Sequence, residues 1–258
     1  MSGAVRTATA PAASVITGAS AGIGRALAFR TAERHGGTIA LVGRDGDALG
    51  EVAAEVARRG ATPVVARLDV RDVPGLTRFL EDFDDAHQVA RLWVNAGTAA
   101  GPRPGEVRED AAAVDRVIAV NLRAAIATVG ALVERMRGRR AGRIGLVSSV
   151  SALTPLPELA TYGATKAGLL AYGDAIRPPL RRDGVSVTVL CPGFVTSAMS
   201  ARHLGPRPFE ISAERAARIM DDALEARRAV VVFPWQMAAL AALARLAPRP
   251  VFDRVIGL

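Results

Sequence analysis

The 258-residue sequence is poor in cysteine, aromatic residues, lysine and long hydrophobic runs. Its one cysteine, Cys191, excludes an internal disulfide and is typical of a reducing compartment, so we expect a cytoplasmic protein. Aromatic side chains make up 4% of the chain, too few for the stacking platforms of single-strand nucleic-acid binders. Residues 1–12 lack the continuous apolar core of a secretory signal, and we expect a disordered tail there.

Positive charge is the strongest compositional bias, with 33 basic against 25 acidic residues and a formal net charge of +8. The arginines are dispersed rather than gathered in one basic stretch, so we expect no nucleic-acid partner. Half of the residues are apolar and 22% are charged, which indicates a folded chain. The length fits one large domain, which we assign to residues 13–258.

Short β-branched runs alternate with amphipathic segments along the whole chain. The strand-like runs are 14–17, 38–42, 63–68, 91–95, 143–149, 185–191 and 229–233, and the helical patterns are 22–35, 46–59, 73–85, 110–137, 159–182 and 212–227. Such alternation with nearly all-apolar strands predicts an α/β protein, a doubly wound parallel sheet (Rossmann fold) of about seven strands with helices on both faces. Ligands of these sheets bind beyond the carboxyl ends of the strands, so unusual residues should follow strand ends.

A glycine-rich turn, TGASAGIG, follows the first predicted strand. Gly18 can make a tight turn, Gly22 lets the backbone approach a pyrophosphate, and Gly24 lets the next helix pack closely on the sheet. The turn alone is also compatible with a plain strand-to-helix connection.

The segment TYGATK carries Tyr162 and Lys166, and Lys166 is the only lysine in the sequence. Residues four apart on a helix lie on one face, one turn apart. A phenol with a pKa near 10 is a poor base at neutral pH unless a nearby positive charge stabilises its anion. Arginine is a poor substitute for that compact charge, because its planar head has a different reach.

Together the TGASAGIG turn and the TYGATK segment resemble the short-chain dehydrogenase/reductase family, in its short single-domain branch. The resemblance covers about residues 13–200 and implies a catalytic set of Asn121, Ser149, Tyr162 and Lys166. In this set Tyr162 is the general acid or base, Ser149 polarises the substrate oxygen, Lys166 lowers the pKa of the phenol, and Asn121 completes a proton relay.

The resemblance also implies a nicotinamide cofactor bound along the strand ends. The cofactor-binding residues it implies are Gly18, Ser20, Gly22, Ile23, Gly24, Arg25, Arg44, Asp69, Val70, Asn95, Gly97, Tyr162, Lys166, Pro192, Gly193, Val195 and Thr196. Asp69 is the family's adenine contact, although an aspartate before a helix is also typical of a helix cap. No metal is expected.

Cofactor choice follows from charge at the end of the second strand. Binders of NAD place an acidic residue there, whereas this chain has Gly43 followed by Arg44, with Arg25 approaching from the helix after the glycine-rich turn. Two guanidinium groups suit a 2′-phosphate, so we expect NADP(H). The alternative is that Arg44 is a loop arginine and that Asp45, the next residue, matters instead.

The substrate is expected between the segment after Ser149 and the segment after Phe194. The residues there are mainly apolar and include Leu153, Leu156, Leu159, Phe194 and Met199, so we expect an apolar carbonyl substrate, although such residues also serve plain packing. A stretch at about 197–212 is expected to act as a substrate lid.

The C-terminal part, about 235–258, departs from the common family pattern. A strand followed by an alanine-rich helix near 235–246 is expected, either packing on its own subunit, closing the pocket, contacting a partner subunit or lying on a membrane surface. Pro178 and Pro179 should kink or end the helix that carries Tyr162. That helix usually forms the dimer face in the family, so a homodimer or homotetramer is expected, with an assembly that can differ.

The resulting hypothesis is an NADP(H)-dependent oxidoreductase that transfers a hydride between nicotinamide and a carbonyl or secondary alcohol, with an apolar ketone as substrate. The alternative is a catalytically idle, NADP(H)-binding regulatory protein. The complete Asn–Ser–Tyr–Lys set argues against that alternative, because a sensor has no need of it.

Overall fold

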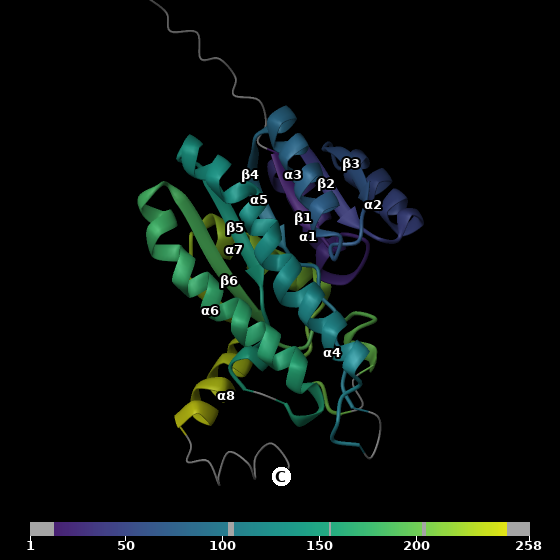
Figure 1. The fold of residues 1–258 in the computed structure, drawn as a ribbon, viewed down its shortest axis with the longest axis vertical. Coiled ribbons are helices and arrows are strands. Elements are labelled where there is room, and N and C mark those ends of the chain that lie inside the picture. Colours follow the sequence, from purple (N-terminus) through teal and green to yellow (C-terminus); the bar gives the residue numbers. More distant parts are fainter. Residues whose placement is uncertain (1–12, 103–105, 155, 203–204, 247–258) are drawn as a thin grey trace, which may run out of the picture.

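A computed structural model describes residues 13–102, 106–154, 156–202 and 205–246. Strands and helices alternate through it (Figure 1). The strands are β1 (Ala13–Thr17), β2 (Thr38–Gly43), β3 (Thr62–Arg67), β4 (Val89–Val94), β5 (Gly142–Val147), β6 (Val185–Pro192) and β7 (Val230–Phe233). The helices are α1 (Gly22–His35), α2 (Gly46–Arg58), α3 (Val73–His87), α4 (Ala111–Ile118), α5 (Ala124–Arg139), α6 (Ala160–Arg182), α7 (Ala213–Glu225) and α8 (Trp235–Leu246), with short helical turns η1 (Ala119–Arg123), η2 (Val150–Ala152), η3 (Pro157–Leu159) and η4 (Ser200–Arg202).

The seven strands form one parallel sheet in the order β3-β2-β1-β4-β5-β6-β7. This confirms the predicted doubly wound fold. The order reverses between β1 and β4, and in such sheets the crevice beyond these two strand ends receives the ligand.

Helices cover both faces of the sheet and bury two separate apolar clusters. One face carries α3, α5 and α6, and the other carries α1, α2 and α7. Neighbouring residues of a strand alternate between the clusters: Val15 faces the first and Ile16 the second. Because both faces are covered, the strands are apolar throughout rather than alternating with polar residues.

The long helical pattern at 110–137 is not one α-helix. α4 and α5 are joined by the π-helical turn η1, and Asn121 lies in that turn with its side chain fully buried. The Ala124 N–H donates to the Ala119 carbonyl, five residues back. Asparagine is unfavourable in the interior of an α-helix, and here it lies where the helix changes to a π-helical turn. Such turns are frequent at functional sites.

The stretch from Ala111 to Arg139 is long and apolar enough to cross a membrane by length and composition alone. Its buried residues, including Val117, Val129 and Leu132, are fully enclosed by the protein. We therefore interpret the stretch, which consists of α4, η1 and α5, as packing on the sheet with its buried side, since α5 contacts β4 and β5.

Of the two expected effects of the prolines in α6, a kink or an end, the end is wrong. The helix continues through Pro178 and Pro179 to Arg182. Both prolines are exposed, as are Asp174 and Ala175, whose carbonyls lose a helical partner, so water can take those hydrogen bonds. Leu180, one residue further on, is buried in the core and holds the last turn against the sheet.

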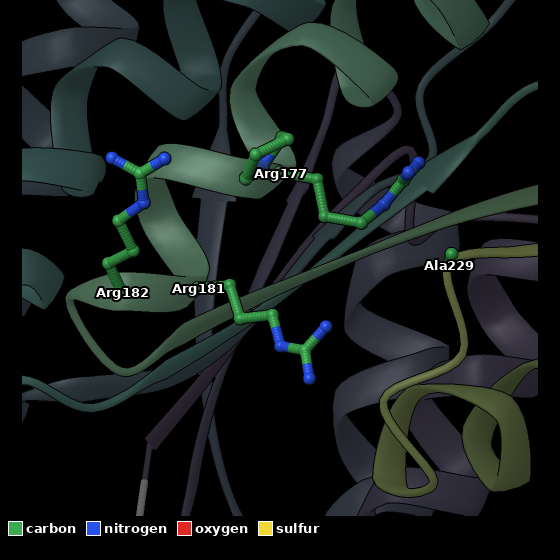
Figure 2. A pocket seen from close by; sticks show the side chains of 5 residues that line it. Arg177, Arg181, Arg182 and Ala229 are labelled. Carbon is green, nitrogen blue, oxygen red and sulfur yellow. The ribbon is translucent and has the colours of Figure 1, made fainter.

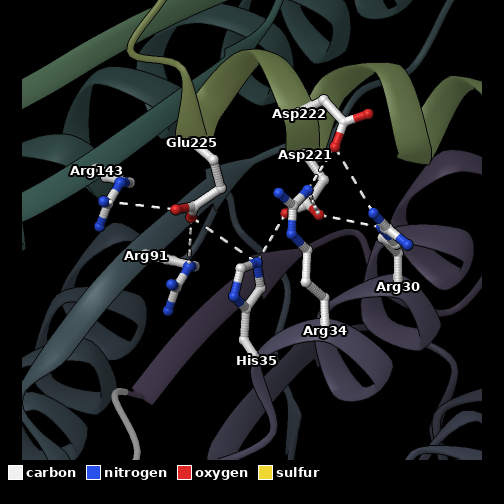
Figure 3. Close-up of polar contacts among 8 residues, drawn as sticks. All are labelled: Arg30, Arg34, His35, Arg91, Arg143, Asp221, Asp222 and Glu225. Carbon is white, nitrogen blue, oxygen red and sulfur yellow. Dashed lines mark hydrogen bonds and ion pairs between the residues drawn. The ribbon is translucent and has the colours of Figure 1, made fainter.

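An ion-pair network joins α1 to α7 at the opposite end of the sheet from the glycine-rich turn (Figure 3). The fully buried carboxylate of Asp221 accepts hydrogen bonds from Arg30 at 3.1 Å and Arg34 at 2.9 Å, and contacts His35 Nε2 at 3.0 Å. Glu225, one turn further along α7, pairs with Arg91 at 3.0 Å.

His35, Asp221 and Glu225 bring their ligand atoms within 4.8 Å of one another, the spacing of a metal site. Guanidinium groups already compensate both carboxylates, however, so the cluster needs no cation to balance its charge. Burial raises the pKa of Asp221, but hydrogen bonds and charges from His35 and Arg34 outweigh it, and the pKa lies below its ordinary value.

We expect Asp221→Asn to lower the free energy of unfolding by on the order of 3 kcal/mol, because it breaks a buried pair at its charged centre. The lowered pKa means that this contribution is present above about pH 4 and is lost as the pH falls through the folded pKa. Urea unfolding at neutral and acidic pH measures both effects.

Asp222→Asn is the matched control, because Asp222 is the neighbouring residue but its side chain is 63% exposed. Its cost should stay below about 1 kcal/mol. Equal costs for the two variants would contradict a central role for Asp221.

Candidate active site

The glycine-rich turn after β1 adopts a conformation that requires glycine. Gly18 has φ +69°, and a Cβ there would lie 2.9 Å from Ala96 Cα. A Cβ on Gly24 would collide with the Gly18 carbonyl. The turn is therefore packed directly against the end of β4, which fixes the start of α1 at the crevice between β1 and β4.

The start of α1 has the features of an anion site. Its N-cap residue, Ala21, offers no side-chain hydrogen bond, and the first turn holds no acidic residue. By contrast, α2, α3, α4 and α7 are each capped by a polar side chain, from Asp45, Asp72, Asp110 and Ser212. The backbone N–H groups of the first turn of α1 have no side-chain acceptor, and the helix end carries partial positive charge. Both features favour binding of a pyrophosphate, so the residues present suit a dinucleotide.

Thr17 and Asn95 brace this turn from the two neighbouring strand ends. The Thr17 hydroxyl accepts from the backbone N–H of Asn95 at 3.0 Å and of Ala96 at 3.1 Å. The Asn95 amide donates to the carbonyls of Thr17 at 3.0 Å and Gly18 at 3.2 Å. Sequence reasoning missed Thr17, and it assigned Asn95 to the ribose, which stays a prediction.

The Arg25 and Arg44 side chains are both exposed, and neither guanidinium makes a hydrogen bond or ion pair with any residue that the structure describes. Each is close enough to a carboxylate to lower its pKa, Arg25 that of Glu214 and Arg44 that of Asp69. Ser20 and Arg25 line a cavity of about 390 Å³ between α1 and α2. The Asp45 carboxylate is engaged elsewhere, since it accepts the Ala48 N–H at 3.1 Å as the cap of α2.

Asp69 follows β3 at the same edge of the sheet. It is not a helix cap, because Asp72 caps α3 instead. Its carboxylate pairs with Arg71 at 2.6 Å, and hydrogen bonds from Arg71, opposed by burial, hold its pKa below the usual range. Val70 beside it is buried. Contact with an adenine stays a prediction for both residues.

Ser149, Tyr162 and Lys166 are brought together by β5 and α6. Ser149 lies two residues beyond the end of β5 rather than in the strand, and caps the turn η2 by accepting from the Ser151 N–H at 3.1 Å. Its hydroxyl donates to the Ser151 hydroxyl at 3.3 Å, and its proximity to the Tyr162 phenol acts to lower the pKa of that phenol. Ser148 is committed elsewhere, since it donates to the Lys166 carbonyl at 2.8 Å.

The Lys166 ammonium is buried and lies 5.7 Å from the centre of the Tyr162 ring. It donates to the Val147 carbonyl, at the end of β5, at 2.8 Å. A Cβ on Gly97 would lie 3.5 Å from Lys166 Nζ, so the segment after β4 closes in on the lysine. The ammonium thus lies where three chain segments converge.

Burial shifts both titratable groups of this pair toward their neutral forms. It raises the pKa of Tyr162, opposed by the nearby Ser149 hydroxyl, and lowers the pKa of Lys166 to about 8. The phenol is therefore protonated at neutral pH and able to donate a proton, while most of the lysine remains charged.

Asn121 is held beside this pair by both of its amide atoms. Its oxygen accepts the Thr98 N–H at 2.8 Å, and its nitrogen donates to the Thr98 carbonyl at 2.9 Å and the Thr165 hydroxyl at 3.2 Å. These partners join the segment after β4 to α6. Sequence reasoning missed Thr98 and Thr165, and no periodic pattern singles them out.

The segment after β6 forms the remaining wall. The Gly193 N–H donates to the Phe233 carbonyl at 2.7 Å, and a Cβ on Gly193 would lie 2.9 Å from Met237 of α8. Pro192 ends β6, Val195 is paired with Ile211, and the Thr196 N–H donates to the Ile211 carbonyl at 3.0 Å. α8 therefore packs on the segment 192–196, which carries four of the residues expected to bind the cofactor.

The segment expected as a lid, 197–212, is joined to this wall near its end, where Ile211 pairs with Val195, and some of its residues also contact one another. Ser200 contacts Ser197 at its start and Glu210 near its end, and Ser197 lies over Gly22. Of the residues expected to face substrate, Leu153, Leu156, Leu159 and Phe194 are half-buried and Met199 is 40% exposed. Closure of the segment stays a prediction.

A surface depression of about 600 Å³ lies elsewhere, near the C-terminal end of α6 (Figure 2). It is lined by Arg177, Pro178, Arg181, Arg182 and Ala229. Fifteen residues of helix separate Arg177 from Tyr162, a rise of about 22 Å. The depression is thus remote from the residues assembled above.

Comparison with known proteins identifies close resemblances along most of the chain. A family model described as short chain dehydrogenase matches residues 12–205. An uncharacterized oxidoreductase of Myxococcus xanthus is 32% identical over 240 residues, covering 93% of this chain and 94% of that protein.

Solved structures agree in fold. A short-chain dehydrogenase from Sphingobium yanoikuyae in complex with NADPH superimposes with a TM-score of 0.80 at 26% identity, covering 94% of this chain and 95% of the other. A short chain dehydrogenase from Mycobacterium paratuberculosis bound to NAD gives a TM-score of 0.76 at 24% identity, covering 86% and 95%. Proteins of this fold thus bind either nicotinamide cofactor.

We expect Lys166→Met to change stability in a pH-dependent way. The lowered pKa means that the charged lysine destabilises the folded state by on the order of 3 kcal/mol below pH 8, and that this cost is relieved as the pH rises toward 10.5. The gain in unfolding free energy of the variant over the wild type should therefore shrink between pH 8 and 10.5. Denaturant unfolding across this range is the measurement, and a constant difference would contradict the buried-charge explanation.

Proposed function

The chain belongs to the short chain dehydrogenase family, and we propose that it is an NADP(H)-dependent oxidoreductase that reduces an apolar ketone to a secondary alcohol. The convergence of Ser149, Tyr162 and buried Lys166 beside the uncapped start of α1 is the observation that carries the proposal. It combines a proton donor, a polarising hydroxyl and a dinucleotide cradle at one edge of the sheet.

The cofactor would be held by the glycine-rich turn, the strand ends and the segment 192–196, and supplies the hydride. The Tyr162 phenol donates the proton that the reduced carbonyl oxygen requires, and its raised pKa keeps that proton available at neutral pH. The Ser149 hydroxyl donates a hydrogen bond to the same oxygen as negative charge develops there.

Lys166 and Asn121 support the proton transfer. The Lys166 charge, one helical turn from the phenol, stabilises the phenolate that remains after donation. Asn121, fixed by Thr98 and Thr165, orders the polar surroundings through which the proton is replaced. In the oxidative direction the same groups act in reverse.

The choice of NADP(H) rests on Arg25, Arg44 and Asp45. The two guanidinium groups are free to pair with a 2′-phosphate, while the carboxylate that would favour a ribose hydroxyl caps α2. The preference for an apolar ketone rests on the half-buried Leu153 and Leu156 in the segment after Ser149 and on the half-buried Phe194 after β6.

Tyr162→Phe should abolish carbonyl-dependent NADPH oxidation, with a loss of at least about 100-fold in kcat, because the proton donor is removed. The dissociation constant for NADPH should stay within about twofold. Steady-state assays with a broad set of ketones, together with NADPH titration, measure both. The alternative of an idle regulatory protein predicts NADPH binding without turnover in the wild type as well.

Arg44→Ala should weaken NADPH binding by about 10- to 100-fold and leave NADH binding nearly unchanged, because a charge-assisted phosphate pair contributes about 1.5–3 kcal/mol. Fluorescence titration with both cofactors gives the ratio. Arg135→Ala makes the same charge change on α5, where Arg135 pairs with Asp85, and should leave both affinities unchanged. Equal wild-type affinities for the two cofactors would remove the basis for an NADP(H) preference.

A further inference from the structure

The helix that carries Tyr162 and Lys166 begins without a cap of its own. The N-cap position of α6 is Leu159, which makes no side-chain hydrogen bond to the helix. Leucine is among the least favourable residues at this position, because it offers no acceptor to the first N–H groups. The first turn nevertheless presents the reacting phenol, so its position matters to the chemistry.

An acceptor comes from a distant segment. The Glu109 carboxylate, just before α4, accepts the Thr161 N–H at 3.2 Å and the Thr161 hydroxyl. Thr161 is 52 residues away in sequence and directly precedes Tyr162. A carboxylate at this place also interacts favourably with the positive end of the helix.

A second contact joins the same two segments. Gly101, in the connection between β4 and α4, lies so close to the Glu158 carbonyl that a Cβ there would collide with it. Glu158 belongs to η3, the turn that leads into α6. Among the described residues, both Gly101 and Glu109 of the connection after β4 therefore contact the start of α6, and Glu109 does so through hydrogen bonds.

We propose that Glu109 is a positioning residue of the active site: by fixing the first turn of α6, it holds Tyr162 in register with Ser149. The inference rests on the proposed function. The Tyr162 carbonyl accepts from the Thr165 hydroxyl at 2.8 Å, and Thr165 in turn contacts Asn121. A displaced first turn would thus disturb the phenol and the Asn121 contacts together.

The chain offers a close comparison for Glu109 in its neighbour Asp110. The Asp110 carboxylate accepts the Ala113 N–H at 3.0 Å and caps α4. Removing it deletes the same kind of interaction, one residue away, from a helix that holds none of the four catalytic side chains. A general loss of stability should therefore appear in both variants, whereas a loss of positioning should appear only at Glu109.

The experiment compares wild type, Glu109→Ala, Glu109→Gln and Asp110→Ala in the full chain. Glu109→Ala should lower kcat by about 10- to 100-fold, the scale of a small misplacement of a reacting group, with the NADPH dissociation constant unchanged. Glu109→Gln should recover most of kcat, because its amide oxygen still accepts from Thr161. Asp110→Ala should keep kcat within about twofold of wild type.

Hydrogen exchange of the peptide around residues 157–164 provides a readout that needs no turnover. It should be faster in Glu109→Ala than in the other three proteins. Wild-type kcat in Glu109→Ala, an equal loss of kcat in Asp110→Ala, or unchanged exchange in Glu109→Ala would each overturn the proposal. If the wild type reduces no ketone at all, the proposed function fails instead, and the exchange comparison alone decides whether Glu109 fixes this turn.

Discussion

Parallel strand direction is the constraint on which the rest of this structure depends. Because all seven strands run the same way, the segments after β1, β4, β5 and β6 emerge at one edge of the sheet. Residues far apart in sequence, such as Gly18, Ser149 and Gly193, therefore reach a common region without any long connection through the core. α6 completes the arrangement, since it places a phenol and an ammonium one helical turn apart against the end of β5.

Arginine and lysine have distinct tasks in this arrangement. Two guanidinium nitrogens of Arg139 donate hydrogen bonds to the Asp84 carboxylate at 2.6 and 2.7 Å. Arg30 and Arg34 both donate to the Asp221 carboxylate. Arginine guanidinium groups thus stabilise carboxylates where helices meet the sheet. A guanidinium keeps its charge in almost any surroundings. The buried ammonium of Lys166 does not, and its lowered pKa places it close to the range in which proton transfer is useful.

Much of this could be predicted from the sequence, because apolar runs, glycine spacing and the Tyr–Lys interval depend on local periodicity. The doubly wound parallel sheet followed from these patterns, as did a strand and helix near the C-terminus, whereas the order of the strands was not predicted. The continuation of α6 through Pro178 could not be predicted, since it depends on which side of the helix faces water. The π-helical turn at Asn121 and the Glu109 contact depend on partners brought close only by the fold. For the same reason sequence reasoning missed Thr17, which joins two strand ends.

The uncapped start of α1 also has a consequence for the stability and the abundance of the protein in the cell. Any dinucleotide that satisfies those N–H groups binds the folded chain and not the unfolded one, so it raises the population of folded molecules by mass action. A hundredfold excess over the dissociation constant contributes about 2.7 kcal/mol, a large share of the stability of an ordinary domain. Abundance of this protein would then follow the supply of its cofactor, because molecules without it unfold and are degraded more often.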